Sequence, residues 1–508
     1  MPPGNGSLPD LFAQAGIRHV SIHRPPTTRP FRWDGWAGGR VYVHVENDIT
    51  NDLPIHHGDL PHDLPLDHVD HGVLGFIDLA RLEDANAVAH RDNSTGGAVW
   101  LHILHAIGAD GTFESPNVPP LANHGAATNA NQLGAWNPLP FARHAVVSLP
   151  IPSGTPPWGL CDARGARHPV QIVEGPIGRE LLTTIKLDAL AATVFEPLFD
   201  PVPSCHWEVT RTVIDNGRVR AELDPLGQIV RLCTDGRFVD WSGPALQPLL
   251  DGLPFSGQVT TTVLEEGPVR ARIAVNRVGP RGQLHVMYTL HAHDDILRVA
   301  VSWNGESEIV LDFPTTNRSA PLEVAGDLAS WLVKQRHDVR IPDRPLIPGV
   351  RWARLHDDNH AGLAIIGSRP LTMSALSGHI TVHVSRTANF ALGENARSVN
   401  AIPLSCLSLS LATPHRAAAT GVLPGLFRLE GGQTVPWWVR RPDGWCGEIL
   451  LGQQAHARSR TVLYLSDCTE VQRCDLRGTV VQKLTPTPDG DGYEIDLLGG
   501  GLTLIRWR

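Results

Sequence analysis

Four stretches near the middle of the chain decide its fold: residues 258–266 (QVTTTVLEE), 269–275 (VRARIAV), 283–290 (QLHVMYTL) and 296–304 (ILRVAVSWN). Apolar and polar residues alternate in each, and β-branched residues are frequent. A period of two places neighbouring side chains on opposite faces of a strand. Gly279-Pro280 supplies the chemistry of a turn between two of the stretches. We therefore predict consecutive antiparallel strands with a buried face.

The same pattern continues on both sides of this centre. Alternating stretches predict further strands at residues 145–151, 218–223, 229–233 and 308–314. So many strands joined by short turns favour a large antiparallel β-sandwich, which we place at residues 136–420. A last set predicts a small C-terminal β domain at residues 421–508, with strands at 462–467, 479–485, 493–498 and 502–508. The predicted fold class is mainly β.

Residues 1–50 have a different character, that of an α/β segment. Residues 11–15 follow Leu8-Pro9-Asp10 as a short helix that Gly16 can end. Residues 17–22 and 40–45 then predict two strands.

Residues 51–135 form a third kind of segment, rich in His, Asp and Asn. The apolar spacing in residues 73–90 and 99–107 predicts helices. Proline and glycine in residues 115–130 mark a linker. We therefore predict a short helical and linker region before the sandwich.

Composition and charge exclude several classes of protein. The 508 residues carry 43 Lys+Arg against 52 Asp+Glu, a net charge of −9, which disfavours nucleic acid as a partner. No apolar run approaches the roughly 20 residues that a membrane-spanning helix needs. The seven cysteines contain no C-x-x-C, which favours reduced thiols over a disulfide framework or a zinc ribbon. The first residues also lack the pattern of a secretory signal, so we predict a cytoplasmic protein.

Several segments of the β region occur in the same order as similar motifs of a known family. They are Ala135–Arg143 (AWNPLPFAR), Asn216–Asp224 (NGRVRAELD), Leu264–Ala271 (LEEGPVRA), His293–Trp303 (HDDILRVAVSW) and Gly501–Arg506 (GLTLIR). In this order they resemble the C-terminal half of glycoside hydrolase family 38, the retaining α-mannosidases. The resemblance implies a mutarotase-like supersandwich preceded by part of an α/β barrel. It also implies a mannose-containing glycan as the partner.

The N-terminal residues extend the resemblance. Leu8–Ile17 resembles the helix that follows the family's catalytic Asp, and Arg29–Gly35 with Gly39–Val41 resembles the segment after it. In this register the nucleophilic Asp falls at Met1 or immediately upstream, and the family's early H-x-D zinc pair lies further upstream. A retaining glycosidase needs two carboxyl groups about 5–5.5 Å apart. We therefore expect the chain as given not to hydrolyse mannosides unaided.

A His/Asp cluster is the most conspicuous local feature for metal binding. It comprises His56–Asp59, His62-Asp63 and His68–His71, and both residue types are zinc ligands. The resemblance implies a zinc ion, and His57 and His62 are the ligands we predict for it. The alternative is a solvated loop that is simply rich in histidine.

Two other groups of residues have both a binding and a structural interpretation. Trp331, Trp352, Trp437 and Trp438 could stack on sugar rings, but aromatic residues in sandwiches mostly belong to the core. Residues 356–360 (HDDNH) could hold a cation, but their pattern is also typical of a hairpin turn.

Three functional hypotheses follow. The first is a family 38 α-mannosidase-like glycoside hydrolase that would act on α-mannosides by a retaining, zinc-assisted mechanism once its catalytic segment is complete. The second is a non-catalytic carbohydrate-binding or scaffolding sandwich, which leaves a homo-oligomer open. The third is a sandwich-fold lyase or mutarotase in which His291, His293 and Asp294 act as acid/base groups.

Overall fold

The computed structural model describes part of the chain from residue 19 onward. The described residues are 19–23, 31–34, 40–46, 75–76, 133–137, 139–151, 155–175, 178–189, 191–203, 207–234, 236–239, 241–316, 322–326, 330–333, 346–355, 362–376, 378–394, 404–412, 416–417, 427–431, 434–440, 444–453, 459–465, 468–475, 478–490, 492–497 and 501–508. Among these residues, no helix is long and apolar enough to cross a bilayer.

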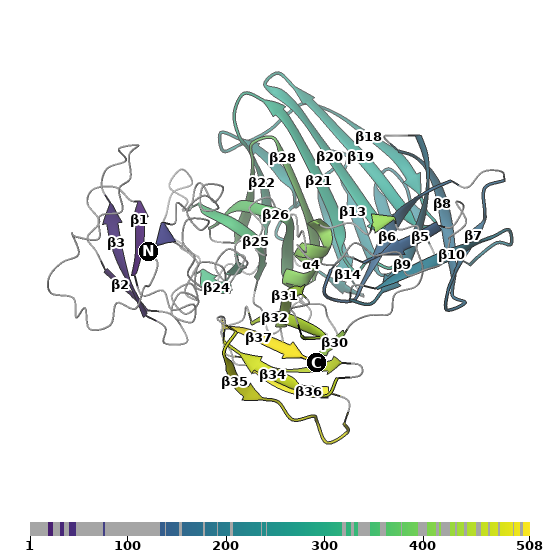
Figure 1. Ribbon diagram of the computed structural model, residues 1–508. Coiled ribbons are helices and arrows are strands. Elements are labelled where there is room, and N and C mark those ends of the chain that lie inside the picture. The colour runs from purple at the N-terminus through teal and green to yellow at the C-terminus, as the bar shows by residue number, and fades with distance from the viewer. Residues whose placement is uncertain are drawn as a thin grey trace.

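Four short strands near the N-terminus form one mixed sheet (Figure 1). Its order is β2 (Phe31–Asp34), β3 (Arg40–Glu46), β1 (His19–His23) and β4 (Gly75–Phe76). β1 pairs in parallel with both β3 and β4, and the strands predicted at residues 17–22 and 40–45 coincide with β1 and β3. The α/β assignment of residues 1–50 stays a prediction. β2 and β4 were not predicted.

The strand β4 corrects part of the helix predicted over residues 73–90. Gly75–Phe76 pair with Val20–Ser21 of β1 instead of continuing a helix. A short apolar run can form either a buried strand or a helix, and periodicity alone does not distinguish them. The helix predicted at residues 11–15 lies outside the described residues.

A sheet that we call the leading sheet comes next. In the described part of the chain its order is β29-β5-β10-β7-β8-β9-β6. The strands are β5 (Leu133–Trp136), β6 (Arg143–Pro150), β7 (Gly159–Asp162), β8 (Arg167–Gly175), β9 (Gly178–Leu187), β10 (Ala192–Leu198) and β29 (Arg416–Ala417). β29 comes from far along the chain and pairs with β5 beside the strands that precede the main sandwich.

The main sandwich contains β11 to β28, arranged in two sheets of the described residues. The smaller sheet has the order β11 (Glu208–Val209), β12 (Val213–Asp215), β13 (Val219–Leu223), β14 (Ile229–Thr234) and β15 (Arg237–Phe238). The larger sheet contains β16 (Gln247–Leu250), β17 (Leu253–Pro254), β18 (Gln258–Glu266), β19 (Arg270–Gly279), β20 (Gly282–His291), β21 (Leu297–Gly305), β22 (Ile309–Pro314), β23 (Leu322–Ala325), β24 (Ser330–Val333), β25 (Ile347–Leu355), β26 (Leu363–Leu376), β27 (His379–Val384) and β28 (Thr387–Glu394). Figure 1 shows its long strands β18 to β21 side by side.

The core of the main sandwich confirms the predicted alternation. Along β20 every second side chain is buried, from Leu284 to Leu290, and the pattern in β19 and β21 is similar. These side chains join one large apolar cluster with those of the smaller sheet, such as Ile214 and Leu232. Burial of this apolar surface is the main force that holds the two sheets together.

A helix that the sequence did not predict packs on the main sandwich. The helix α4 (Leu404–Ala412) has the sequence LSCLSLSLA, whose Ser/Leu alternation also fits a strand. Leu404 and Leu411, seven positions apart on one helix face, pack against a cluster that contains Trp352. The Ser408 hydroxyl donates a hydrogen bond to the Gly367 carbonyl oxygen at 2.5 Å. These tertiary contacts decide between the two local patterns.

The C-terminal unit has two described sheets, which lie below the main sandwich in Figure 1. They are β30 (Phe427–Glu430), β33 (Ser459–Leu465) and β36 (Gly492–Leu497), and β31 (Thr434–Arg440), β32 (Gly447–Gln453), β37 (Leu502–Trp507), β34 (Val471–Cys474) and β35 (Val480–Lys483). An apolar cluster that includes Ile449, Ile495 and Trp507 lies between them. The strands predicted after residue 462 are confirmed, while the predicted domain boundaries stay predictions.

Candidate functional site

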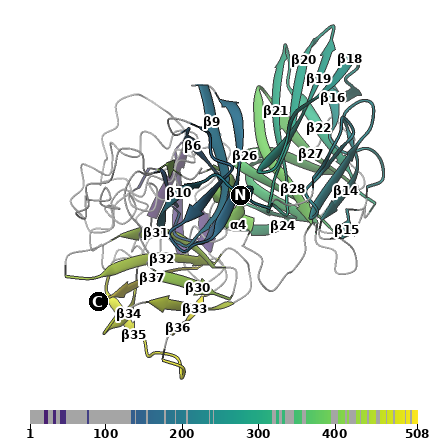
Figure 2. The same ribbon diagram turned by 90° about the vertical axis from the view of Figure 1, so that its right-hand side faces the viewer.

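The leading sheet packs against the main sandwich at an interface that we call the seam (Figure 2). The side-chain amide oxygen of Gln171 on β8 accepts hydrogen bonds from the backbone N–H groups of Val269 and Arg270, at 3.0 and 2.8 Å. An apolar contact lies beside them; its members are Val146, Val173, Leu182 and Val269. Four of the segments that carry the family resemblance contribute residues to or around this seam.

The LEEGPVRA segment forms the hairpin that meets Gln171. Glu265 makes a bidentate ion pair with Arg270, with distances of 2.7 and 2.8 Å, and a further one with Arg272 at 3.2 Å. Burial raises the pKa of Glu265, but hydrogen bonds and charge from the two arginines outweigh it, so that the pKa lies below its ordinary value. The carboxylate is therefore ionised near neutral pH and fixes the hairpin.

Asn216 joins the turn between β12 and β13 to the turn that follows β20. Its side-chain N–H₂ group donates to the carbonyl oxygens of His291 and Asp294, at 2.8 and 2.9 Å. Its side-chain oxygen accepts from the backbone N–H groups of Arg218 and Val219, at 2.9 and 2.7 Å. Because Asn216 is almost fully buried, these bonds fix both turns.

The predicted acid/base residues lie in the second of these turns. An oxygen of the Asp294 carboxylate lies 2.7 Å from Nε of Arg298 and 3.3 Å from Nδ1 of His291. Burial raises the pKa of Asp294, but the charges of Arg298 and His291 outweigh it and hold the pKa well below its usual range. Burial and the charge of Arg298 lower the pKa of His291. Asp294 is thus a permanent carboxylate in an ion pair, which is a structural role, and the acid/base role of this turn stays a prediction.

The ring of His293 lies near a strand of the leading sheet. Its ring centroid lies 6.0 Å from that of His144 on β6. His144 is directly opposite Lys186 in the antiparallel register of β6 and β9. Nη1 of Arg218 donates to the carbonyl oxygen of His293 at 3.3 Å. The structure therefore gathers basic side chains from four separate segments of the chain, which sequence patterns do not predict.

The AWNPLPFAR segment anchors the other side of the seam. Nε of Arg143 donates to the side-chain oxygen of Asn137 at 2.9 Å, and Nη1 donates to the carbonyl oxygen of Ser410 at 3.2 Å. The side-chain N–H₂ group of Asn137 donates to the carbonyl oxygens of Phe141 and Asp188, each at 2.8 Å. Burial, together with the charge of Arg298, lowers the pKa of Arg143 to about 9.

A second polar region, missed by the sequence analysis, lies on β22 and β27. Nδ1 of His379 lies 2.8 Å from the Asp312 carboxylate, and Nδ1 of His383 lies 2.9 Å from that of Glu308. The other carboxylate oxygen of Asp312 is buried and lacks a hydrogen-bond partner within the described ranges. The signal was available in the sequence HITVHV, whose alternation puts His379 and His383 on one strand face.

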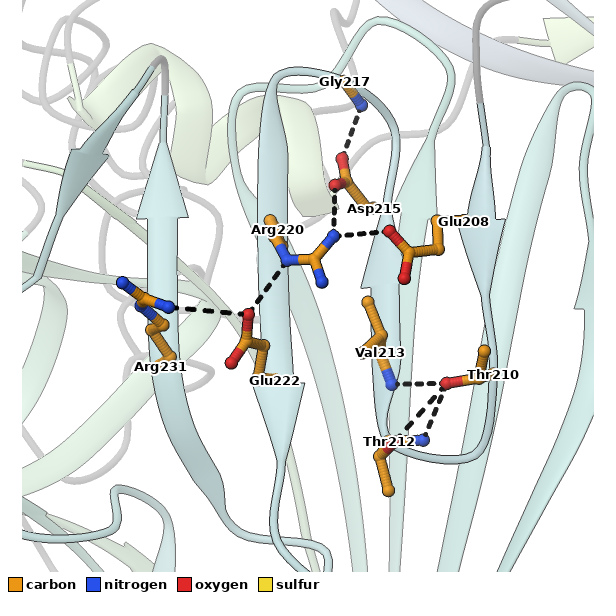
Figure 3. Close-up of polar contacts among 9 residues, drawn as sticks. All are labelled: Glu208, Thr210, Thr212, Val213, Asp215, Gly217, Arg220, Glu222 and Arg231. Atoms are coloured by element: carbon orange, nitrogen blue, oxygen red, sulfur yellow. Dashed lines mark hydrogen bonds and ion pairs between the residues drawn. The ribbon is translucent and has the colours of Figure 1, made fainter.

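A charge network on the smaller sheet is structural (Figure 3). Arg220 contacts the carboxylates of Glu208, Asp215 and Glu222 at 2.5, 3.1 and 3.0 Å, and Arg231 lies 3.9 Å from Glu222. The guanidinium thus occupies the centre of the acidic groups and leaves no space among them for a cation. The network links β11, β12, β13 and β14.

The remaining predicted site residues have different outcomes. His57, His62 and residues 356–360 lie outside the described residues. Trp352 is only 4% exposed and belongs to the core, as its structural interpretation predicts. Trp331, Trp437 and Trp438 have no described side chains. Within the described ranges, no group of three or more His, Cys, Asp or Glu side chains could hold a metal ion.

Comparisons with known proteins address the fold. No protein-family model and no curated protein matches the sequence. A solved structure of an α-mannosidase from Enterococcus faecalis V583 matches with a TM-score of 0.57 and 12% identity, over 85% of this chain and 60% of that chain. A solved protein in glycosyl hydrolase family 38 from Enterococcus faecalis matches with a TM-score of 0.57 and 12% identity, over 85% of this chain and 62% of that chain.

The chain shares its fold with family 38 glycoside hydrolases. The predicted mainly β sandwich and the resemblance are therefore confirmed at the level of fold. The chain spans about 60% of the length of these two solved proteins.

Proposed function

We propose that this chain belongs to a carbohydrate-active protein of the α-mannosidase kind, whose partner is a mannose-containing glycan. The observation that supports the proposal is the fold likeness over 85% of the chain to two solved glycoside hydrolases, one of which is described as an α-mannosidase. Four of the five quoted motif segments lend further support, because they contribute residues to or around the seam of this fold. The packing of the leading sheet on the main sandwich therefore gives a structural reason for the order of these segments.

The chemistry in this proposal follows from the resemblance and from general principles. A retaining hydrolysis needs a carboxylate nucleophile and a carboxylic acid on either side of the glycosidic bond. A zinc ion would bind sugar hydroxyl groups, with His57 and His62 as the proposed ligands. The described residues contain no donor set that fits zinc, so no step of the proposal passes through the metal.

The test compares turnover with binding. The purified chain is incubated with p-nitrophenyl α-mannoside and with an α-linked mannose oligosaccharide, and release of product is measured beside binding by calorimetry. Turnover that first releases the α-anomer of mannose supports the retaining hydrolase. Binding without turnover supports the non-catalytic carbohydrate-binding alternative. The absence of both binding and turnover would overturn the proposal. The control substrate is p-nitrophenyl β-galactoside.

One observation favours the sandwich-fold lyase or mutarotase as a second candidate function. It concerns Asp312 and His379, not the predicted acid/base residues His291, His293 and Asp294. The Asp312 carboxylate holds Nδ1 of His379, and this orientation leaves Nε2 of the partly exposed ring to accept a proton. His379→Gln would then abolish exchange between the α and β anomers of a free sugar, followed by NMR. Unchanged exchange in this variant would exclude His379 from such chemistry.

A further inference from the structure

The strand β18 (Gln258–Glu266) ends the larger sheet of the main sandwich and leaves one backbone edge without a paired strand among the described residues. In Figure 1 it is the outermost of the long strands, beside β19. Every second residue of such a strand directs its N–H and C=O groups away from the sheet. These groups form a row of donors and acceptors with which another strand can pair. The proposed function does not use this edge.

Other edge strands of the described sheets carry features that oppose such pairing. β17 has two residues, one of which is Pro254, and β31 contains Pro436. β35 has four residues and ends with Lys483. Short strands, proline and lysine are the means by which proteins protect an edge. β18 contains neither proline nor a charged side chain from Gln258 to Leu264, so this stretch is an unprotected edge.

The sequence of this edge is symmetric about Thr261. Residues 259–263 read VTTTV in either direction. Two copies of β18 can pair in antiparallel register about a two-fold axis at Thr261. Val259 then lies opposite Val263, and Thr260 lies opposite Thr262. Cross-strand Thr–Thr pairs stabilise a sheet, and Val favours strands. A strand of a different protein has no need of this symmetry, so the symmetry favours a second copy of the chain as the partner.

Charge does not oppose this arrangement. In the same register Glu265 lies opposite Gly257 of the other copy. Glu266 lies opposite Ser256, so no carboxylate faces another one. Glu265 is also paired within its own chain with Arg270, at 2.7 Å. Each copy has a net charge of −9, but exposed charges that are farther apart than the Debye length of about 8 Å are largely screened at physiological salt.

We propose that β18 pairs with the β18 strand of a second copy of this chain, antiparallel and about a two-fold axis at Thr261. The contact surface is then the same on both copies, as a closed two-fold dimer requires. Main-chain hydrogen bonds join the larger sheets of the two copies, and the side chains set the register of the pairing. This inference rests on the position and the sequence of β18 and is independent of the proposed function.

Sedimentation velocity of the full chain at several protein concentrations tests the pairing. The wild type is expected to form a dimer as the concentration rises. Thr260 and Thr262 are exposed, so replacing both by Lys spares the partly buried face of β18 and places lysines opposite each other across the axis. Thr260→Lys/Thr262→Lys is therefore expected to weaken dimerisation about tenfold or more. Val480→Lys/Val481→Lys, on the exposed edge strand β35, is the matched control and is expected to dimerise as the wild type does. Circular dichroism verifies that all variants are folded.

A mixing experiment tests the register. Thr260→Glu/Thr262→Glu is expected to weaken self-association in the same way, because carboxylates then face each other across the axis. A mixture of the Lys and Glu variants is expected to form dimers again, since each lysine then faces a carboxylate. A wild type that stays monomeric at every concentration overturns the proposal, as does a Lys variant that dimerises like the wild type. A mixture that forms no dimers, or an equal loss in the β35 control, also overturns it.

Discussion

Replacing Asn216 by Ala tests whether the seam holds the two turns that meet there. The substitution removes two donated hydrogen bonds, to the carbonyl oxygens of His291 and Asp294, and two accepted ones. It changes no charge and creates little new apolar contact. The expected loss is therefore that of buried polar groups left without partners.

The magnitude follows from the burial of those groups. The carbonyl oxygen of Asp294 and the N–H group of Val219 lose their partner in a buried place. The His291 carbonyl oxygen keeps the backbone N–H of Asp294 as a donor at 3.2 Å, and Arg218 lies at the surface. At about 1–1.5 kcal/mol for each of two buried groups, the substitution costs about 2–3 kcal/mol. That energy corresponds to roughly one and a half to two orders of magnitude in the equilibrium for local opening.

Hydrogen exchange measured by mass spectrometry is the suitable assay, because a chain with several units does not unfold in one transition. Peptides that cover residues 286–298 and 213–223 should exchange faster in the variant by the factor given for local opening. The exchange of peptides that cover β33 and β36 should not change. Asn216→Asp should be at least as damaging, since a carboxylate oxygen would then face two carbonyl oxygens. Asn304→Ala removes an exposed side chain in β21 and should cost less than about 0.5 kcal/mol. Wild-type exchange in the Asn216→Ala variant would refute the reasoning.

Three other outcomes are expected. Glu265→Gln should destabilise the hairpin of β18 and β19 near neutral pH. Because the pKa of Glu265 is lowered on folding from an ordinary value of 4.5, the wild-type advantage should hold above that value and disappear as the pH falls through the lowered pKa. Hydrogen exchange of wild type and variant, compared at each of several pH values in peptides that cover residues 258–279, would detect this. Tyr288→Phe should cost about 1 kcal/mol, because the buried hydroxyl donates to the Gly227 carbonyl oxygen at 2.7 Å. Unchanged hydrogen exchange in peptides that cover residues 223–229 and 284–290 would contradict this. Iodoacetamide should label the exposed Cys446 in the native protein but not Cys406, whose thiol is buried and whose pKa is raised by that burial; equal labelling in a peptide map would show that the site opens.

The sequence alone predicted the strands and the faces that they bury. The stretch QVTTTVLEE coincides with β18, and the alternation in QLHVMYTL gives the buried and exposed faces of β20. These features depend on neighbours along the chain, since a period of two is a local property of an extended backbone. Dependence on local pattern also explains why the helix α4 was not predicted. Its Ser/Leu alternation fits a strand, but packing on Trp352 selects a helix.

Only the tertiary structure decided which residues form the seam and which basic side chains gather there. His144 lies on β6 and His293 in the turn after β20. Asn216 reaches the same turn through two carbonyl groups that have no sequence signature. The sequence presented these segments as separate motifs in a fixed order, without a reason for the order. Burial of Val146, Val173, Leu182 and Val269 brings the leading sheet onto the sandwich, and the motifs become neighbours through that packing. Strand patterns are set by local geometry, whereas contacts between distant segments are set by the apolar surface that the sheets bury together.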